Sequence, residues 1–260
     1  MQKFPTFFLS HGSPMHAIHA GAAGEVWAAL AKNLPKPKAA LMVTAHWETN
    51  LPMLSGNAKP SMIYDFAGFP DELYKIVYPA PGEPDIAARA QTLLKSAGFT
   101  AGIDGCRGLD HGTWVPLLKM YPDADVPIVQ LSVQTAINPR HHYEVGRALA
   151  PLTKEGVLIV GSGHLTHNLR DWMTSRGQTA HAPYAQKFQS WVHDHLAKHD
   201  VDGLTNYRQA APDATRAHPT EEHFLPLFVA LGAAGADAEP ERVFAGFEGT
   251  ALAMDAYRFN

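Results

Sequence analysis

The stretch Val157-Leu158-Ile159-Val160-Gly161-Ser162-Gly163-His164 begins as an aliphatic run and ends in a histidine. Two earlier runs have the same form: Phe7-Phe8-Leu9 leads to His11, and Leu41-Met42-Val43 leads to His46. Short apolar runs bounded by Gly, Ser or Thr are typical of buried strands. Polar residues that follow parallel strands meet in the crevice beyond the carboxyl edge of the sheet. The three runs therefore predict an α/β protein with histidines gathered at one edge.

The rest of the chain alternates between strand and helix patterns. Strands are expected at 6–9, 39–44, 52–55, 99–103, 126–132, 157–161 and part of 242–247, and helices at 25–34, 84–97, 138–149, 183–197 and 220–231. This alternation indicates an α/β sandwich. Two stretches, 57–82 and 104–113, fit neither pattern, and long loops of this kind are often functional. The aromatic residues of 57–82 predict either a wall or lid over a pocket, or a loop packed on the surface.

Composition limits the classes of function. The 260 residues are 46% hydrophobic and contain no linker or repeat, which predicts a single catalytic domain over residues 1–260. The net charge of -4 and the scattered Lys and Arg argue against nucleic acid as a partner. One cysteine, Cys106, fits a reducing compartment. Without a signal peptide or an apolar run of roughly 20 residues, we expect a cytoplasmic protein with no membrane contact.

Histidine is the commonest metal-binding side chain, although some of the 15 histidines must follow apolar runs by chance. His11 and His46 are the best two candidates for a mononuclear site. The third ligand is open at this point, and the candidates from 218–223 are His218, Glu221, Glu222 and His223. Of His164 and His167, one could bind the metal while the other handles protons. His111 is a further candidate, or else a histidine in a capped turn.

Five short strings are more specific than these patterns: LSHGSP (9–14), TAHWET (44–49), YDFAGFP (64–70), GLDHGTWVPL (108–117) and HPTEEH (218–223). Together they resemble the DOPA-dioxygenase-type class III extradiol ring-cleavage dioxygenases, within the LigB-like superfamily. The strings occur in the same order, from about residue 11 to about residue 231.

The resemblance implies a three-layer α/β/α sandwich with a mostly parallel or mixed central sheet. It also implies a mononuclear non-haem Fe(II), sometimes found as zinc, at which O₂ opens the ring of a catechol such as DOPA or caffeate. By position, His11, His46 and His223 match the family's metal ligands. His167 matches its acid/base histidine, and His111 matches a pocket histidine thought to contact oxygen or substrate.

The metal stays open between iron and zinc. Better-known relatives that cleave protocatechuate carry a glutamate as the third ligand, whereas this chain has His223. Two histidines and one carboxylate are typical of oxygen-activating iron, but three histidines also form catalytic zinc sites. His164 stands where relatives have a small or polar residue, which leaves the roles of His164 and His167 open to exchange.

Four aromatic residues would suit the walls of a catechol pocket, namely Trp47, Tyr64, Phe66 and Trp114. Arg170 is a candidate partner for a substrate carboxylate. Two other functions compete with ring cleavage. One is a zinc hydrolase acting on an amide or ester, with Glu48 or Glu222 as base. The other is a non-catalytic binding protein of the Memo type. The sequence does not indicate an oligomeric state.

Overall fold

A mixed sheet runs through the centre of the computed structural model, which describes residues 3–175 and 177–260 of the expected domain 1–260. Within those residues, eight strands pair in the order β4 (Gly102–Asp104), β3 (Met53–Ser55), β5 (Ile128–Val133), β2 (Ala39–Glu48), β6 (Val157–Gly163), β1 (Thr6–Ser10), β10 (Ala256–Phe259) and β7 (Pro240–Phe244). The central strands β5, β2, β6 and β1 are parallel, whereas β10 and β7 add antiparallel pairs at one edge. The predicted α/β class with a mixed sheet is confirmed.

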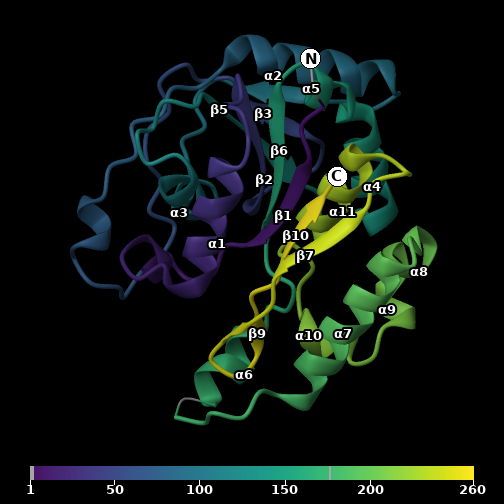
Figure 1. The fold of residues 1–260 in the computed structure, drawn as a ribbon. Helices are drawn as coiled ribbons and strands as arrows, with labels where there is room; N and C mark the ends of the chain where they lie inside the picture. The colour runs from purple at the N-terminus through teal and green to yellow at the C-terminus, as the bar shows by residue number, and fades with distance from the viewer. Residues whose placement is uncertain (1–2, 176) are drawn as a thin grey trace.

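Alternate residues of the central strands face two separate cores, as the strand period requires. In β1, Phe7 and Leu9 pack in one core and Phe8 in the other. Helices α1 (Gly21–Lys32) and α3 (His111–Met120) cover the Phe7 face (Figure 1). The Phe8 face is covered by α2 (Pro84–Ser96), α4 (Pro139–Leu149), α7 (Pro183–Ala197) and α11 (Leu225–Ala234). These layers match the expected three-layer sandwich.

Shorter elements complete the described fold. They are the helices η1 (Pro14–Ala17), η2 (Leu73–Lys75), α5 (Pro151–Lys154), α6 (Leu169–Thr174), α8 (Val201–Thr205), α9 (Tyr207–Ala210) and α10 (Ala214–Ala217), and the hairpin of β8 (Phe247–Glu248) and β9 (Leu252–Ala253). In the described part of the chain, every helix is too short or too polar to cross a bilayer.

The predicted helix 220–231 is displaced in the structure. Residues 220–223 form turns, and α11 begins only at Leu225. Pro226 has no N–H to donate, so it is tolerated in the first turn of a helix and fixes the start of α11 there. The stretch 104–113 was expected to be irregular, but α3 already begins at His111. The Asp110 side chain accepts a hydrogen bond from Thr113 N at 3.2 Å and caps that helix.

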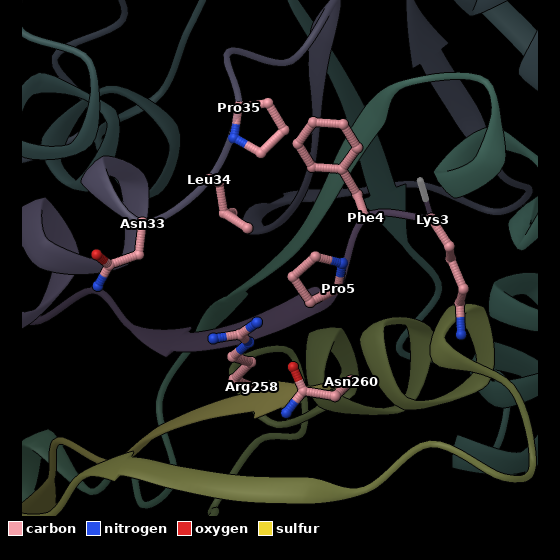
Figure 2. A pocket seen from close by; sticks show the side chains of 8 residues that line it. All are labelled: Lys3, Phe4, Pro5, Asn33, Leu34, Pro35, Arg258 and Asn260. Carbon is pink, nitrogen blue, oxygen red and sulfur yellow. The ribbon is translucent and has the colours of Figure 1, made fainter. Parts of the chain in front are cut away.

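A hollow of about 390 Å³ lies at the amino-terminal end of β1, at the opposite end of that strand from His11 (Figure 2). It is lined by residues before β1, residues after α1 and the end of β10, namely Lys3, Phe4, Pro5, Asn33, Leu34, Pro35, Arg258 and Asn260. None of the predicted site residues contributes to this lining. His11, His46 and His164 lie instead near the carboxyl ends of β1, β2 and β6.

Two glycines let β6 lie directly against the start of α11. A Cβ atom on Gly161 would lie 2.3 Å from the carbonyl oxygen of Pro226, and one on Gly163 would lie 2.1 Å from that of His223. Both distances are far below van der Waals contact. The glycines of the opening sequence stretch therefore set the distance between the central strand and the segment that contains His223.

We expect Gly161→Ala to lower the free energy of unfolding by about 1–3 kcal/mol, because the added methyl group overlaps a backbone carbonyl in a packed core. Urea unfolding followed by circular dichroism measures the change. Gly105→Ala is the matched control, since Gly105 is exposed and nothing lies within 4 Å of its Cβ position. Equal effects from the two substitutions would contradict the close approach.

Candidate metal centre

The order of the central strands brings three histidines together at one edge of the sheet. His11 directly follows β1, His164 directly follows β6, and His46 lies near the end of β2. The ring centroid of His11 is 5.0 Å from that of His46 and 5.3 Å from that of His164. Since β2, β6 and β1 are neighbours, the three apolar runs of the sequence end at one place, as predicted.

His223 joins this group from the turn before α11. Its backbone carbonyl accepts a hydrogen bond from His164 N at 2.8 Å, which ties the turn to the end of β6. The ring centroid of His223 is 5.5 Å from that of His11 and 4.9 Å from that of His46. One nitrogen from each of these three rings lies within 4.8 Å of the other two. The three could therefore hold one metal ion.

The partner at Nδ1 leaves the other ring nitrogen of His11 and of His46 unprotonated. Ser162 Oγ donates its proton to the carbonyl oxygen of Gly112, so His11 Nδ1 must donate to Ser162 Oγ, 3.0 Å away. His46 Nδ1 lies 3.2 Å from a carboxylate oxygen of Asp65, which only accepts. Two bare Nε2 atoms then face each other at 3.0 Å.

The close approach of the two Nε2 atoms suits a cation bound between them. Two unprotonated nitrogens repel each other at this distance unless a cation or a proton lies between them. Two donors about 2.1 Å from one ion, at right angles, would lie about 3.0 Å apart. His223 follows the same design, because its Nδ1 lies 2.9 Å from Glu222 Oε1 and its Nε2 is left free of that proton. Ligating histidines in proteins are held in this way by a partner at the second ring nitrogen.

Burial keeps these imidazoles neutral. It lowers the pKa of His11 and of His223 well below the ordinary value of 6.5, and the neighbouring histidines lower the pKa of both further. The pKa of His46 is also lowered, by burial first and then by His111, against the opposing effect of Asp65. Neutral imidazole is the form that binds a metal. The three residues are thus in the ligating state before any ion arrives.

Asp65 connects His46 to His111. One oxygen of its carboxylate lies 3.2 Å from His46 Nδ1, and the other lies 2.9 Å from His111 Nδ1 and 3.0 Å from His111 N. Burial raises the pKa of Asp65, but the His111 hydrogen bonds outweigh it and lower the pKa to about 2. The ionised carboxylate therefore fixes both rings, one of them at the start of α3.

His167 and His164 occupy different positions. The ring of His167 stacks on that of His223, with centroids 3.5 Å apart, and its Nδ1 is 4.0 Å from Glu222 Oε1, beyond hydrogen-bond distance. Within the described residues, neither ring nitrogen of His167 has a hydrogen-bond partner. His164 is only 2% exposed, and its Nδ1 is enclosed without a partner among the same residues. His167 is the more accessible of the two.

The cluster lies in a cavity of about 310 Å³. Its lining includes His11, Gly12, Ser13, Pro14, His46, Asp65, Phe66, Phe69, His111, His164, His167, Leu169, Trp172, His223, Glu248 and Leu252. Part of the irregular stretch 57–82 thus forms a wall of this cavity, which is one of the two outcomes expected from the sequence. Imidazoles and two carboxylates share the space with apolar rings, an arrangement suited to a flat aromatic ligand with a polar edge.

Only some of the predicted pocket residues line the cavity. Phe66 and His164 do, but Tyr64 and Trp114 lie behind Phe66, with ring centroids 6.1 and 6.2 Å from it. Trp47 lies outside the lining because successive side chains of a strand point to opposite faces, and its ring stacks under the Arg107 guanidinium instead. Arg170 is exposed on α6 and also lies outside the lining.

The structure also separates the four candidates for the third ligand. His218 is fully buried elsewhere, with its Nε2 2.8 Å from the carbonyl oxygen of Leu165. Glu221 accepts a hydrogen bond from the Tyr207 hydroxyl at 2.8 Å. Glu222 accepts a hydrogen bond from His223 Nδ1, and His223 is the candidate ligand that lies close to His11 and His46.

Sequence reasoning missed Asp65 and Glu248. Asp65 lies inside the quoted string YDFAGFP, and an acidic residue between aromatic ones in a loop was the available signal. Glu248 comes from a two-residue strand, for which the sequence has no periodic pattern. Asp65 thus reaches the cavity from an irregular loop, and Glu248 reaches it from a very short strand.

The chain is similar to known proteins over nearly its whole length. Residues 5–256 match the family described as the catalytic LigB subunit of aromatic ring-opening dioxygenase. The chain is 44% identical over 259 residues to the 4,5-DOPA dioxygenase extradiol of Beta vulgaris, covering 98% of this chain and 96% of that protein. It is 40% identical over 234 residues to the protein of the same name from Escherichia coli (strain K12), covering 89% and 85%.

A solved structure gives the same result for the fold. The crystal structure of an uncharacterized protein from Escherichia coli K12 superposes with a TM-score of 0.86 and 34% sequence identity, and the match covers 100% of both chains. The mixed sheet and its helices are therefore shared with that protein over the full length.

We expect His11→Ala and His46→Ala to lower bound metal from about one ion per chain to a small fraction, because each removes one of three ligands. Elemental analysis after reconstitution with Fe(II) or Zn(II) and gel filtration measures this. The control is His199→Asn, at an exposed residue with φ of 53°, a conformation that Asn tolerates. Full metal occupancy in His46→Ala would rule out its role as a ligand.

Proposed function

The chain belongs to the LigB family of aromatic ring-opening dioxygenases and is an extradiol dioxygenase, and from this premise we propose that it opens a DOPA-type catechol ring at a mononuclear Fe(II) centre. DOPA, caffeate and related catechols are the substrates considered, with O₂ as the second reactant. One observation carries this proposal. Three imidazoles with free Nε2 atoms meet in a cavity whose walls include Phe66 and Phe69.

Fe(II) is the metal that suits the reaction. Three imidazoles could bind either iron or zinc, but zinc has no redox chemistry and cannot pass electrons to O₂. His11, His46 and His223 would hold the ion. When bound, it would supply open positions for the catechol oxygens and O₂ and a path for electrons between them.

His167 is the proposed acid/base residue. A catechol must lose protons from its hydroxyls on binding, and a proton must return to the product later. His167 lines the cavity and has both ring nitrogens free of hydrogen bonds from the described residues, so its imidazole can take up and return a proton. The enclosed Nδ1 of His164 makes that residue less suited to the task.

His111 is proposed to act on the substrate or on O₂ as a hydrogen-bond donor or acceptor. Its Nδ1 is occupied by Asp65, which leaves Nε2 as the working atom. The ring centroids of His111 and His46 are 4.0 Å apart, so this atom lies beside the proposed metal ligands. Phe66 packs edge-on against the same ring, with centroids 5.7 Å apart, and limits the access of water.

The two rival functions have less support. A zinc hydrolase was expected to use Glu48 or Glu222 as its base, but Glu48 accepts a hydrogen bond from Thr135 Oγ1 at 2.7 Å and lies outside the cavity lining. Glu222 also lies outside the lining, and its Oε1 accepts hydrogen bonds from Thr220 and His223. A non-catalytic Memo-type protein would have no need for an acid/base histidine beside a complete set of ligands.

We expect the iron-loaded enzyme to be inert toward DOPA without oxygen and to open the ring once air is admitted. The reason is that O₂ supplies both atoms inserted into the product. An oxygen electrode, with mass spectrometry of the product formed under ¹⁸O₂, measures the reaction. Hydrolysis of an amide or ester by the zinc-loaded protein under argon would instead support the hydrolase.

We expect His167→Ala to keep its metal but to lose roughly 100-fold or more in kcat, because general acid/base catalysis is worth about 10²–10⁴-fold. Steady-state kinetics and elemental analysis on the same sample measure both. His141→Ala is the control, since His141 lies outside the cavity lining. Normal turnover by His167→Ala would exclude the assigned role and favour His164 as the acid/base residue.

A further inference from the structure

The described lining of the cavity contains more Asp and Glu than Lys and Arg. Of the described residues in its lining, two are acidic, Asp65 and Glu248, and none is Lys or Arg. Arg170, the predicted partner for a substrate carboxylate, is exposed on α6 outside this lining. Among the residues that the structure describes, a substrate side chain in the cavity therefore meets two carboxylates and no Lys or Arg.

Only one of the two carboxylates has an oxygen to spare. Both oxygens of Asp65 are used by His46 and His111. Glu248 uses Oε2 alone, which accepts from Ser13 N at 3.1 Å and contacts His16 Nε2 at 3.1 Å. Glu248 Oε1 has no hydrogen-bond partner in residues 3–175 and 177–260. One oxygen of a residue that lines the cavity is thus without a partner among the described residues.

Glu248 is charged although it is largely enclosed. Its side chain is 21% exposed. Burial raises the pKa of Glu248, but the hydrogen bond from His16, together with His164 and Ser13 N, lowers it to about 2. A partly buried carboxylate with an unused oxygen forms its strongest hydrogen bond with a cationic donor.

The hairpin that contains Glu248 is fixed in place. Phe247 stacks on His181, with ring centroids 4.3 Å apart. The carbonyl oxygen of Ala251 accepts from Thr166 Oγ1 at 2.8 Å, and Ala253 N donates to the same hydroxyl at 2.7 Å. The carboxylate is therefore held ready at its position, which is what selective binding of a charged group requires.

We propose that Glu248 binds the ammonium group of the substrate through Oε1, and so makes the enzyme selective for catechols that carry an amine over catechols that carry only a carboxylate. This inference rests on the proposed function and narrows its substrate class. An amine-free acid such as 3-(3,4-dihydroxyphenyl)propionate would bring a second negative charge toward Glu248, and no Lys or Arg among the described lining residues would offset it.

The test compares two ligands on the Fe(II)-loaded protein under argon, where no turnover occurs. Isothermal titration calorimetry gives the dissociation constants of dopamine and of 3-(3,4-dihydroxyphenyl)propionate. We expect dopamine to bind the unmodified protein about 10- to 100-fold more tightly, as for one hydrogen bond to a charged group. In Glu248→Gln, the ratio of the two constants should fall close to one, with metal content unchanged.

Two results would overturn the proposal: equal affinities in the unmodified protein, or an equal loss for both ligands in Glu248→Gln, which would indicate a structural role. Glu248→Asp keeps the charge, so it should keep part of the preference, and complete loss of preference there would also contradict the proposal. Glu239→Gln is the matched control, at a side chain that is 79% exposed, and should leave the ratio unchanged.

The same samples separate this inference from the proposed function. If the protein prefers dopamine through Glu248 but opens neither ring in air, the dioxygenase substrate is wrong while the ammonium site stands. If it opens both rings and shows no preference, ring cleavage stands and the role of Glu248 is refuted.

Discussion

Each proposed metal ligand depends on a partner at its far nitrogen. Ser162 and Glu222 accept hydrogen bonds from Nδ1 of His11 and of His223, and a carboxylate oxygen of Asp65 lies 3.2 Å from His46 Nδ1, so all three rings present bare Nε2 atoms. Without these partners, a buried imidazole could adopt either tautomer, and the nitrogens would not be directed toward one ion. The partners come from β6, from the irregular stretch 57–82 and from the turn before α11. The site therefore depends on all three parts of the fold.

Glu222 places a carboxylate beside the proposed ligand set. It accepts a hydrogen bond from Nδ1 of His223 and would therefore lie one ring away from the bound ion. The negative charge is retained near the site, but the donor is neutral. A hydrogen-bonded carboxylate makes the imidazole a more basic ligand.

The sequence predicted those features that periodicity and strand ends control. The central strands, α2, α4 and α7 lie close to their expected positions, and His11, His46 and His164 meet because parallel strands end at one edge. Their convergence could be inferred, whereas the choice of His223 over His218 could not. That choice depends on a turn whose geometry is set by Pro226 and by the contact with Gly163. Asp65 and Glu248 were missed because loops and two-residue strands have no hydrophobic periodicity from which they could be predicted.

The proposed ligands come from near the two ends of the chain, since His11 follows the first strand and His223 precedes the last long helix. An ion held by both would act as a cross-link that closes a very long loop. The unfolded chain cannot assemble these donors, so binding energy would be coupled to folding of the entire molecule. Metal supply would then affect the stability of the fold as well as the catalytic capacity of the site.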